Sequence, residues 1–119
     1  MDRNIRKLLT DILKAIDEIN MFLEVRPRTF QTLIDDRCFL RAVQMNVAIM
    51  GEAMNRVLKL YPDIAITSVR KVVNTRNYVI HGYDSLSLDI LWNIVVNHLP
   101  LLREEVIALL NAEETESSN

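Results

Sequence analysis

Hydrophobic residues recur every three or four positions through most of the chain, which is the spacing of one face of an α-helix. Near the start, this pattern predicts a first helix with an apolar stripe made of Ile5, Leu8, Leu9, Ile12, Ile16, Ile19 and Phe22. The opposite face of this helix carries charged residues, namely Asp11, Lys14, Asp17 and Glu18. Pro27 is expected to close the helix, because proline has no N–H and clashes with the preceding turn.

A long second helix is predicted after a short connecting turn around "PRTFQTL". Asp35 or Asp36 can cap its N-terminus, and the "YPD" sequence is expected to end it. Its apolar stripe contains Leu40, Val43, Val47, Met50, Met54, Val57 and Leu58. Gly51 lies inside this helix, where glycine costs about 1 kcal/mol relative to alanine. Close approach of another helix would compensate for that cost, and a tolerated packing glycine is the alternative.

Two more helices are expected in the second half of the chain. The third opens at Thr67 or Ser68 and ends at Gly82, because glycine best adopts the left-handed conformation that satisfies the last carbonyls. The fourth starts near Ser87, and Pro100 is expected to kink it or divide it in two. Its inward positions are Leu88, Leu91, Trp92, Val95, Leu99, Leu102, Val106 and Leu109.

Short connections between long amphipathic helices favour antiparallel neighbours. The sequence therefore predicts an all-α fold, an up-and-down bundle of four to five helices. At 119 residues the chain has the length of one domain, which we place at residues 1–111. Residues 112–119, "AEETESSN", are acidic and lack apolar anchors, so a disordered tail is expected there.

Composition narrows the classes of function. A formal net charge of −2 excludes a highly basic nucleic-acid-binding surface, although a local patch of Arg and Lys can still hold a phosphodiester. The single cysteine, Cys38, cannot form an intrachain disulfide, which indicates a reducing compartment. No Cys/His cluster has zinc-ligand spacing, so neither a metal nor a cofactor is predicted. Charged residues interrupt every apolar stretch, and we therefore expect a cytoplasmic protein with no membrane span.

The segment "RNYVIHGY", residues 76–83, raises a chemical question. Residues five apart on an ideal helix point about 140° away from each other, so Arg76 and His81 share a side only if the helix loosens near Gly82. After such a turn, a guanidinium, an imidazole and the Tyr83 phenol would lie within a small volume. Arginine offers a fork of donors to phosphate oxygens, and imidazole exchanges protons near neutral pH.

These groups suit metal-free cleavage of RNA. The ribose 2′-hydroxyl would attack its own phosphorus while His81 moves a proton, and Arg76 would stabilise the charge that develops on the phosphoryl oxygens. One histidine cannot easily supply both proton transfers, so a homodimer is expected to bring a second. A structural role is the alternative, because a histidine beside glycine at a helix end often caps carbonyls or meets the negative end of the helix dipole.

The pattern R-x-x-x-x-H-x-Y resembles the signature of the HEPN superfamily, and Asn77 fits it because a polar residue commonly follows that arginine. Two other segments, "GEAMNRVLKLYPDI" and "LDILWNIVVNHLPLLREEVIALL", resemble helices of HepT-like toxins. The segment "DIAITSVRKVVNTRN" departs from the family, whose members usually have a Pro-Trp pair before the third helix and a Gly-Met step before the arginine. No candidate catalytic position is affected by this departure.

The resemblance implies a homodimer in which two motifs face each other and form a metal-independent endoribonuclease, the toxin of a toxin-antitoxin module. It also implies a partner, a minimal nucleotidyltransferase of the MntA type, that transfers AMP from ATP to Tyr83. By this resemblance Arg76 binds phosphate and His81 transfers protons. Asn77 has a positioning role, and Tyr83 contacts the RNA substrate and carries the modification. Glu52, from the Gly-Glu-Ala segment, is a further hypothesis as the residue that orients Arg76.

Two other classes of function are compatible with the sequence. One is a noncatalytic HEPN module that binds a nucleotide or a nucleotidyltransferase without cutting RNA. The other is a helical scaffold with no connection to nucleic acid. A binding module would be indifferent to loss of His81, whereas a nuclease would lose RNA turnover.

Overall fold

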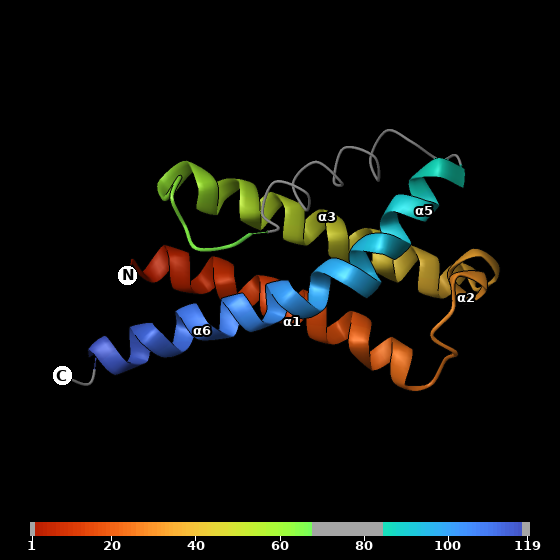
Figure 1. The fold of residues 1–119 in the computed structure, drawn as a ribbon, viewed down its shortest axis with the longest axis horizontal. Helices are drawn as coiled ribbons and strands as arrows, with labels where there is room; N and C mark the ends of the chain where they lie inside the picture. The colour runs from red at the N-terminus through yellow and green to blue at the C-terminus, as the bar shows by residue number, and fades with distance from the viewer. Residues whose placement is uncertain (1, 68–84, 118–119) are drawn as a thin grey trace.

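The computed structural model describes residues 2–67 and 85–117, and these residues form helices and connecting turns without a β-strand. In chain order the elements are α1 (Arg3–Glu24), α2 (Phe30–Asp35), α3 (Arg37–Leu60), α5 (Ser85–Asn93), a π-helical turn (Ile94–His98) and α6 (Leu99–Ser117). The two long helices α1 and α3 run antiparallel, and α6 returns antiparallel to α1 (Figure 1). The prediction of an all-α bundle is confirmed.

Helix α1 follows the sequence prediction closely. Asp2 caps its N-terminus, since the side-chain oxygen accepts the backbone N–H of Asn4 at 2.9 Å. One face is buried and consists of Ile5, Leu9, Ile12, Ala15, Ile16, Ile19 and Leu23. The helix ends at Glu24, ahead of Pro27, as expected for a proline that follows a helix C-terminus.

The segment expected as a connecting turn contains a helix of its own, so this part of the prediction is wrong. The six residues of α2 are capped by Thr29, whose hydroxyl accepts the backbone N–H of Thr32 at 3.2 Å. Leu33 is the buried residue of this helix. Because this short helix buries one side chain, its sequence contains no repeat of apolar residues from which the helix could be predicted.

Asp36 caps α3, which resolves the choice between Asp35 and Asp36. Its Oδ1 accepts the N–H of Phe39 at 3.0 Å, and its Oδ2 accepts a hydrogen bond from Nε of Arg26 at 2.8 Å. The Phe39 N–H and the Arg26 guanidinium hold the pKa of this carboxyl below its ordinary value. The guanidinium also stacks over the rings of Phe22 and Phe39, 5.5 and 5.8 Å from their centroids. One arginine therefore fixes the end of α1 against the start of α3.

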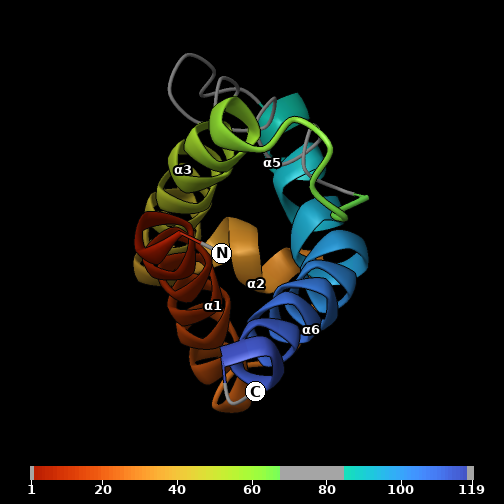
Figure 2. The same ribbon diagram turned by 90° about the vertical axis from the view of Figure 1, so that its left-hand side faces the viewer.

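The core lies between α1, α3 and the α5–α6 helical stretch, which surround it in the end-on view (Figure 2). From α3 the buried side chains are Phe39, Val43, Val47, Met50, Ala53, Met54 and Val57, with Leu40 and Leu58 half-buried beside them. Gly51 is buried as well, which agrees with a close-packed position. Asn46 is the buried polar side chain of the described core, and its Nδ2 donates to the Ala42 carbonyl at 2.9 Å.

The last helix is divided where the sequence predicted, and it extends further than predicted. A π-helical turn separates α5 from α6 directly before Pro100. Inward positions Leu91, Val95, Leu99, Leu102 and Val106 are buried as expected. Helix α6 continues to Ser117, whereas a disordered tail was expected from residue 112. Alanine and glutamate, which dominate residues 112–116, are strong helix formers, so the helix can run on without apolar anchors.

Candidate functional site

The candidate catalytic motif falls outside the described residues. Arg76, Asn77, His81 and Tyr83 belong to residues 68–84, and so does the predicted third helix apart from its first residue, Thr67. Glu52 is described, and it lies exposed on α3. The proposed pairing of Glu52 with Arg76 therefore remains a prediction.

Both ends of the motif-bearing segment are defined by described residues. At its beginning, the backbone N–H and the hydroxyl of Thr67 both donate to the carboxylate of Glu105 on α6, each at 2.9 Å. The preceding residue, Ile66, is buried in the core. At its end, Ser85 begins α5, which packs against α2. The residue before the segment is therefore hydrogen-bonded to α6, and the residue after the segment begins α5.

The face of α3 that carries Glu52 is partly apolar. Met45, Ile49 and Glu52 follow one another at spacings of four and three, so they share one side of the helix. Met45 is 64% exposed and Ile49 is 44% exposed. Two large apolar side chains on a solvent-facing helix surface are a feature typical of interfaces when they belong to a wider patch.

A polar cluster of Asn93, Asn97 and His98, the His98 cluster, lies at the π-helical turn. The Leu99 N–H bonds to the Ile94 carbonyl, five residues back, and Pro100 has no N–H to continue the regular pattern. In this turn Asn97 Nδ2 donates to Asn93 Oδ1 at 2.6 Å, and Asn93 Nδ2 lies 3.4 Å from His98 Nε2. Residues 93 and 98 are five apart and would diverge on an α-helix, so the wider turn is what brings them together.

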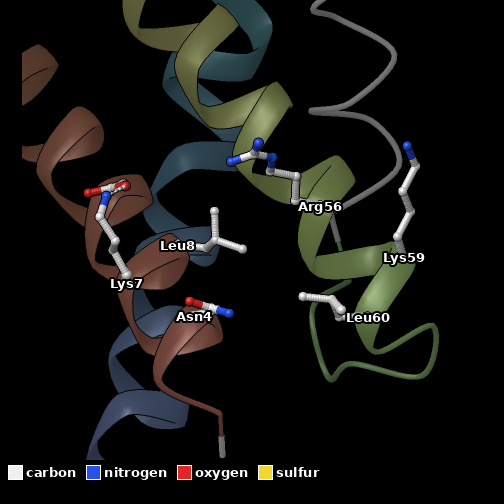
Figure 3. Close-up of a pocket in the computed structure, with 7 residues that line it drawn as sticks. Asn4, Lys7, Leu8, Arg56, Lys59 and Leu60 are labelled. Atoms are coloured by element: carbon white, nitrogen blue, oxygen red, sulfur yellow. Dashed lines mark hydrogen bonds and ion pairs between the residues drawn. The ribbon is translucent and has the colours of Figure 1, made fainter.

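A pocket of about 530 Å³ opens between the beginning of α1 and the end of α3 (Figure 3). Helix α1 contributes Asn4, Lys7, Leu8 and Asp11, and helix α3 contributes Arg56, Lys59 and Leu60. Three cations and one carboxylate line it. The Lys7 ammonium lies 3.0 Å from Asp11 Oδ2. We refer to this site as the Arg56 pocket.

Sequence reasoning missed the Arg56 pocket and the His98 cluster. Residues 4, 8 and 11 recur at helical spacing on one side of the first helix, but nothing in the sequence indicates that this side faces residues 56–60. Hydrophobic periodicity gives no indication that Asn93, Asn97 and His98 come together. Among the described residues no group of three or more His, Cys, Asp or Glu side chains could hold a metal ion.

Comparison with known proteins decides the family. A sequence model described as "Ribonuclease HepT-like" matches residues 12–109. The chain belongs to the HepT-like ribonuclease family. This match covers most of the chain and confirms the resemblance found in its sequence. It also includes the R-x4-H-x-Y motif at residues 76–83.

Three relatives have names that refer to ribonucleases. The chain is 26% identical over 121 residues to "Putative RNase MJ0127" of Methanocaldococcus jannaschii, covering 98% of the chain and 96% of the relative. It is 26% identical over 108 residues to "Putative RNase MJ1380" of the same organism, covering 87% and 94%. With "Probable ribonuclease HepT" of Thermococcus cleftensis it shares 29% identity over 107 residues, covering 87% and 93%. No solved structure matches the chain significantly.

The HepT-like chain shows no helix, within its described residues, that is both long enough and apolar enough to cross a membrane.

Proposed function

We propose that this HepT-like chain is a metal-independent endoribonuclease that acts as the toxin of a toxin-antitoxin module. The observation that carries the proposal is the family match over residues 12–109, a span that contains Arg76, His81 and Tyr83. The names of the three relatives also refer to ribonuclease activity.

The proposed reaction is transesterification within the RNA. The 2′-oxygen forms a bond to the adjacent phosphorus as its proton passes to an imidazole, and the bond from phosphorus to the 5′-oxygen breaks. A second imidazole donates the proton that the leaving 5′-oxygen takes up. Arg76 stabilises the negative charge on the non-bridging oxygens in the transition state, and Asn77 positions the reacting groups. The products carry a 2′,3′-cyclic phosphate and a 5′-hydroxyl.

Two imidazoles at one phosphate require two motifs, because each chain has a single histidine in residues 76–83. We therefore assign the active form to a homodimer with a composite site. The exposed apolar side chains Met45 and Ile49 support this assignment, because they lie on the same face of α3 as Glu52. A dimer formed through that face would bury them beside the residue proposed to orient Arg76.

Neutralisation is assigned to a minimal nucleotidyltransferase of the MntA type. It would transfer AMP from ATP to the Tyr83 hydroxyl, with pyrophosphate as the leaving group. The added phosphate would place negative charge in front of Arg76, and the nucleotide would block access of RNA to the motif.

Glu52 is proposed to pair with Arg76 and hold its guanidinium toward the phosphate. Glu52→Gln keeps the shape of the side chain and removes its charge, so the arginine would be less well oriented. We expect RNA cleavage to fall by about 10-fold, the effect of losing about 1.4 kcal/mol of transition-state stabilisation. Cleavage by Glu52→Gln at the wild-type rate would contradict this role.

The proposed function is tested by incubating antitoxin-free protein with RNA in excess EDTA and identifying the product ends chemically. We expect cleavage to persist, with 2′,3′-cyclic phosphate and 5′-hydroxyl ends, because imidazole and guanidinium replace a metal ion in this chemistry. Intact mass must first establish that Tyr83 is unmodified. Unmodified protein that cleaves no RNA would instead favour a noncatalytic module that binds a nucleotide or a nucleotidyltransferase.

A further inference from the structure

The Arg56 pocket lies between two helices, and each of them contributes both apolar and charged side chains to it. Leu8 and Asn4 of α1 face Arg56 and Leu60 of α3 across it, and Lys59 lies on its outer side (Figure 3). Leu60 is 53% exposed although it is a large apolar residue. The pocket therefore presents uncovered apolar surface directly beside cationic groups.

Most of the positive charge in this pocket has no anionic partner among the described residues. Arg56 and Lys59 form no hydrogen bond or ion pair with another described residue, and both side chains are exposed. Lys7 forms an ion pair with Asp11, with 3.0 Å between Nζ and Oδ2. The Lys7 side chain is 75% exposed and can turn outward. Three cations against one carboxylate leave an excess of two positive charges in a chain whose net charge is −2.

Helix electrostatics explain only part of this arrangement. Lys59 lies in the last turn of α3, where a cation favourably meets the negative end of the helix dipole. That effect falls off within one turn and places no requirement on the opposite helix. It does not account for a hollow in which the Arg56 guanidinium reaches toward Leu8 of α1 (Figure 3).

The chemistry of the lining residues defines the ligand. A guanidinium offers parallel donors to phosphate oxygens, and neighbouring ammonium groups add charge without geometric restriction. Leu8 and Leu60 provide apolar contact for a sugar or a base, and the Asn4 amide offers both a donor and an acceptor to a base edge. A volume of about 530 Å³ lies in the range of small-molecule sites and accommodates one nucleotide.

We propose that the Arg56 pocket binds a nucleoside phosphate. The phosphate belongs either to one nucleotide of the RNA substrate or to a free nucleotide. None of the lining residues is part of the R-x4-H-x-Y motif, so the site is additional to the proposed catalytic groups. The RNA source rests on the proposed function, whereas the free-nucleotide source does not.

The test compares Arg56→Gln with the matched control Arg28→Gln. Arg28 is also exposed and forms no hydrogen bond or ion pair with another described residue, but it follows the far end of α1. A 22-residue helix is about 33 Å long, so the control lies well away from the pocket. Binding is measured with a fluorescent 2′-O-methyl oligoribonucleotide, which cannot undergo 2′-hydroxyl attack, and separately with AMP.

Loss of one charge-assisted hydrogen bond is expected to weaken binding by about 10-fold to 100-fold. The Kd for the oligonucleotide should rise by this factor in Arg56→Gln and stay at the wild-type value in Arg28→Gln. If AMP binding weakens in the same variant while oligonucleotide binding does not, the pocket takes a free nucleotide. Arg56→Lys keeps the charge without the fork and should fall between wild type and Arg56→Gln.

Unchanged Kd values for both probes in Arg56→Gln would overturn the proposal, as would equal weakening by Arg28→Gln. Thermal unfolding of each variant should match the wild type, because Arg56 is exposed. Failure of the proposed function is recognised separately, since wild-type protein would then leave ordinary RNA uncut whether or not either probe binds.

Discussion

Replacement of His81 by alanine is expected to reduce RNA cleavage by about 100-fold to 10,000-fold, the range contributed by general acid-base catalysis. Arg76 would still bind the phosphate, so RNA affinity should change far less than turnover. The measurement is single-turnover cleavage in EDTA, with binding of a 2′-O-methyl oligonucleotide in parallel. Equal rates for wild type and His81→Ala would remove His81 from the mechanism.

His98→Gln is the matched control, because His98 is the other histidine of the chain and lies in the described π-helical turn. It should retain cleavage if the second imidazole comes from the partner's motif. Mixing equal amounts of wild-type and His81→Ala chains tests whether each active site contains histidines from both chains of the dimer. After subunit exchange, a site that needs both histidines leaves about a quarter of the wild-type activity, whereas a site within one chain leaves about half.

Phe39→Ala is expected to lower the free energy of unfolding by about 3–5 kcal/mol. Phe39 is fully buried at the first turn of α3, and its ring lies under the Arg26 guanidinium at 5.8 Å. Truncation removes core contacts and also the surface on which that arginine stacks. Urea denaturation at one fixed protein concentration measures the change, since dimerisation would make stability depend on concentration.

Val25→Ala provides the apolar control for this prediction. Val25 is 80% exposed at the end of α1, so its truncation should change stability by no more than about 0.5 kcal/mol. A loss of less than about 1 kcal/mol in Phe39→Ala would indicate that the junction between α1 and α3 relaxes around the cavity. The packing described for that junction would then be wrong as an account of stability.

The long helices were predictable because their apolar residues repeat over many turns. Ile5 to Phe22 in α1 and Val43 to Val57 in α3 give enough repeats for the period to be unmistakable. Asp36 was one of two candidate caps, and geometry decided between them. Helix α2 was missed because six residues cannot display a period. Its formation depends on the Thr29 cap and on burial of Leu33, and that burial is a tertiary effect.

Other features depended on contacts between distant parts of the chain. Asn46 sits at a core position of α3 because its amide can bond to the Ala42 carbonyl and approach Glu18 Oε1 at 3.4 Å. Hydrophobic patterning assigns an asparagine to the surface, so it gave no indication of this burial. Pro100 indicated a disturbance of the last helix, but it did not indicate that the disturbance would include a π-helical turn at Ile94–His98.

The two candidate sites differ in how they could be found. Arg76, His81 and Tyr83 stand within eight consecutive residues, and their types and spacing alone suggested phosphate chemistry. The Arg56 pocket joins residues about 50 positions apart, and only the antiparallel packing of α1 against α3 brings them together. A local motif can therefore be recognised in a sequence, whereas a site formed between two helices cannot.

The π-helical turn at Ile94–His98 also affects how this chain can change in length. A π turn contains one residue more than the α turn that it replaces. Deleting one residue there would convert the turn to regular α-helix, leaving the Glu105 carboxylate still facing Thr67. The same deletion in the middle of α3 would rotate every later residue of that helix by about 100° and turn its buried face outward. Loss of one residue is therefore expected to be tolerated better in this turn than in the middle of α3.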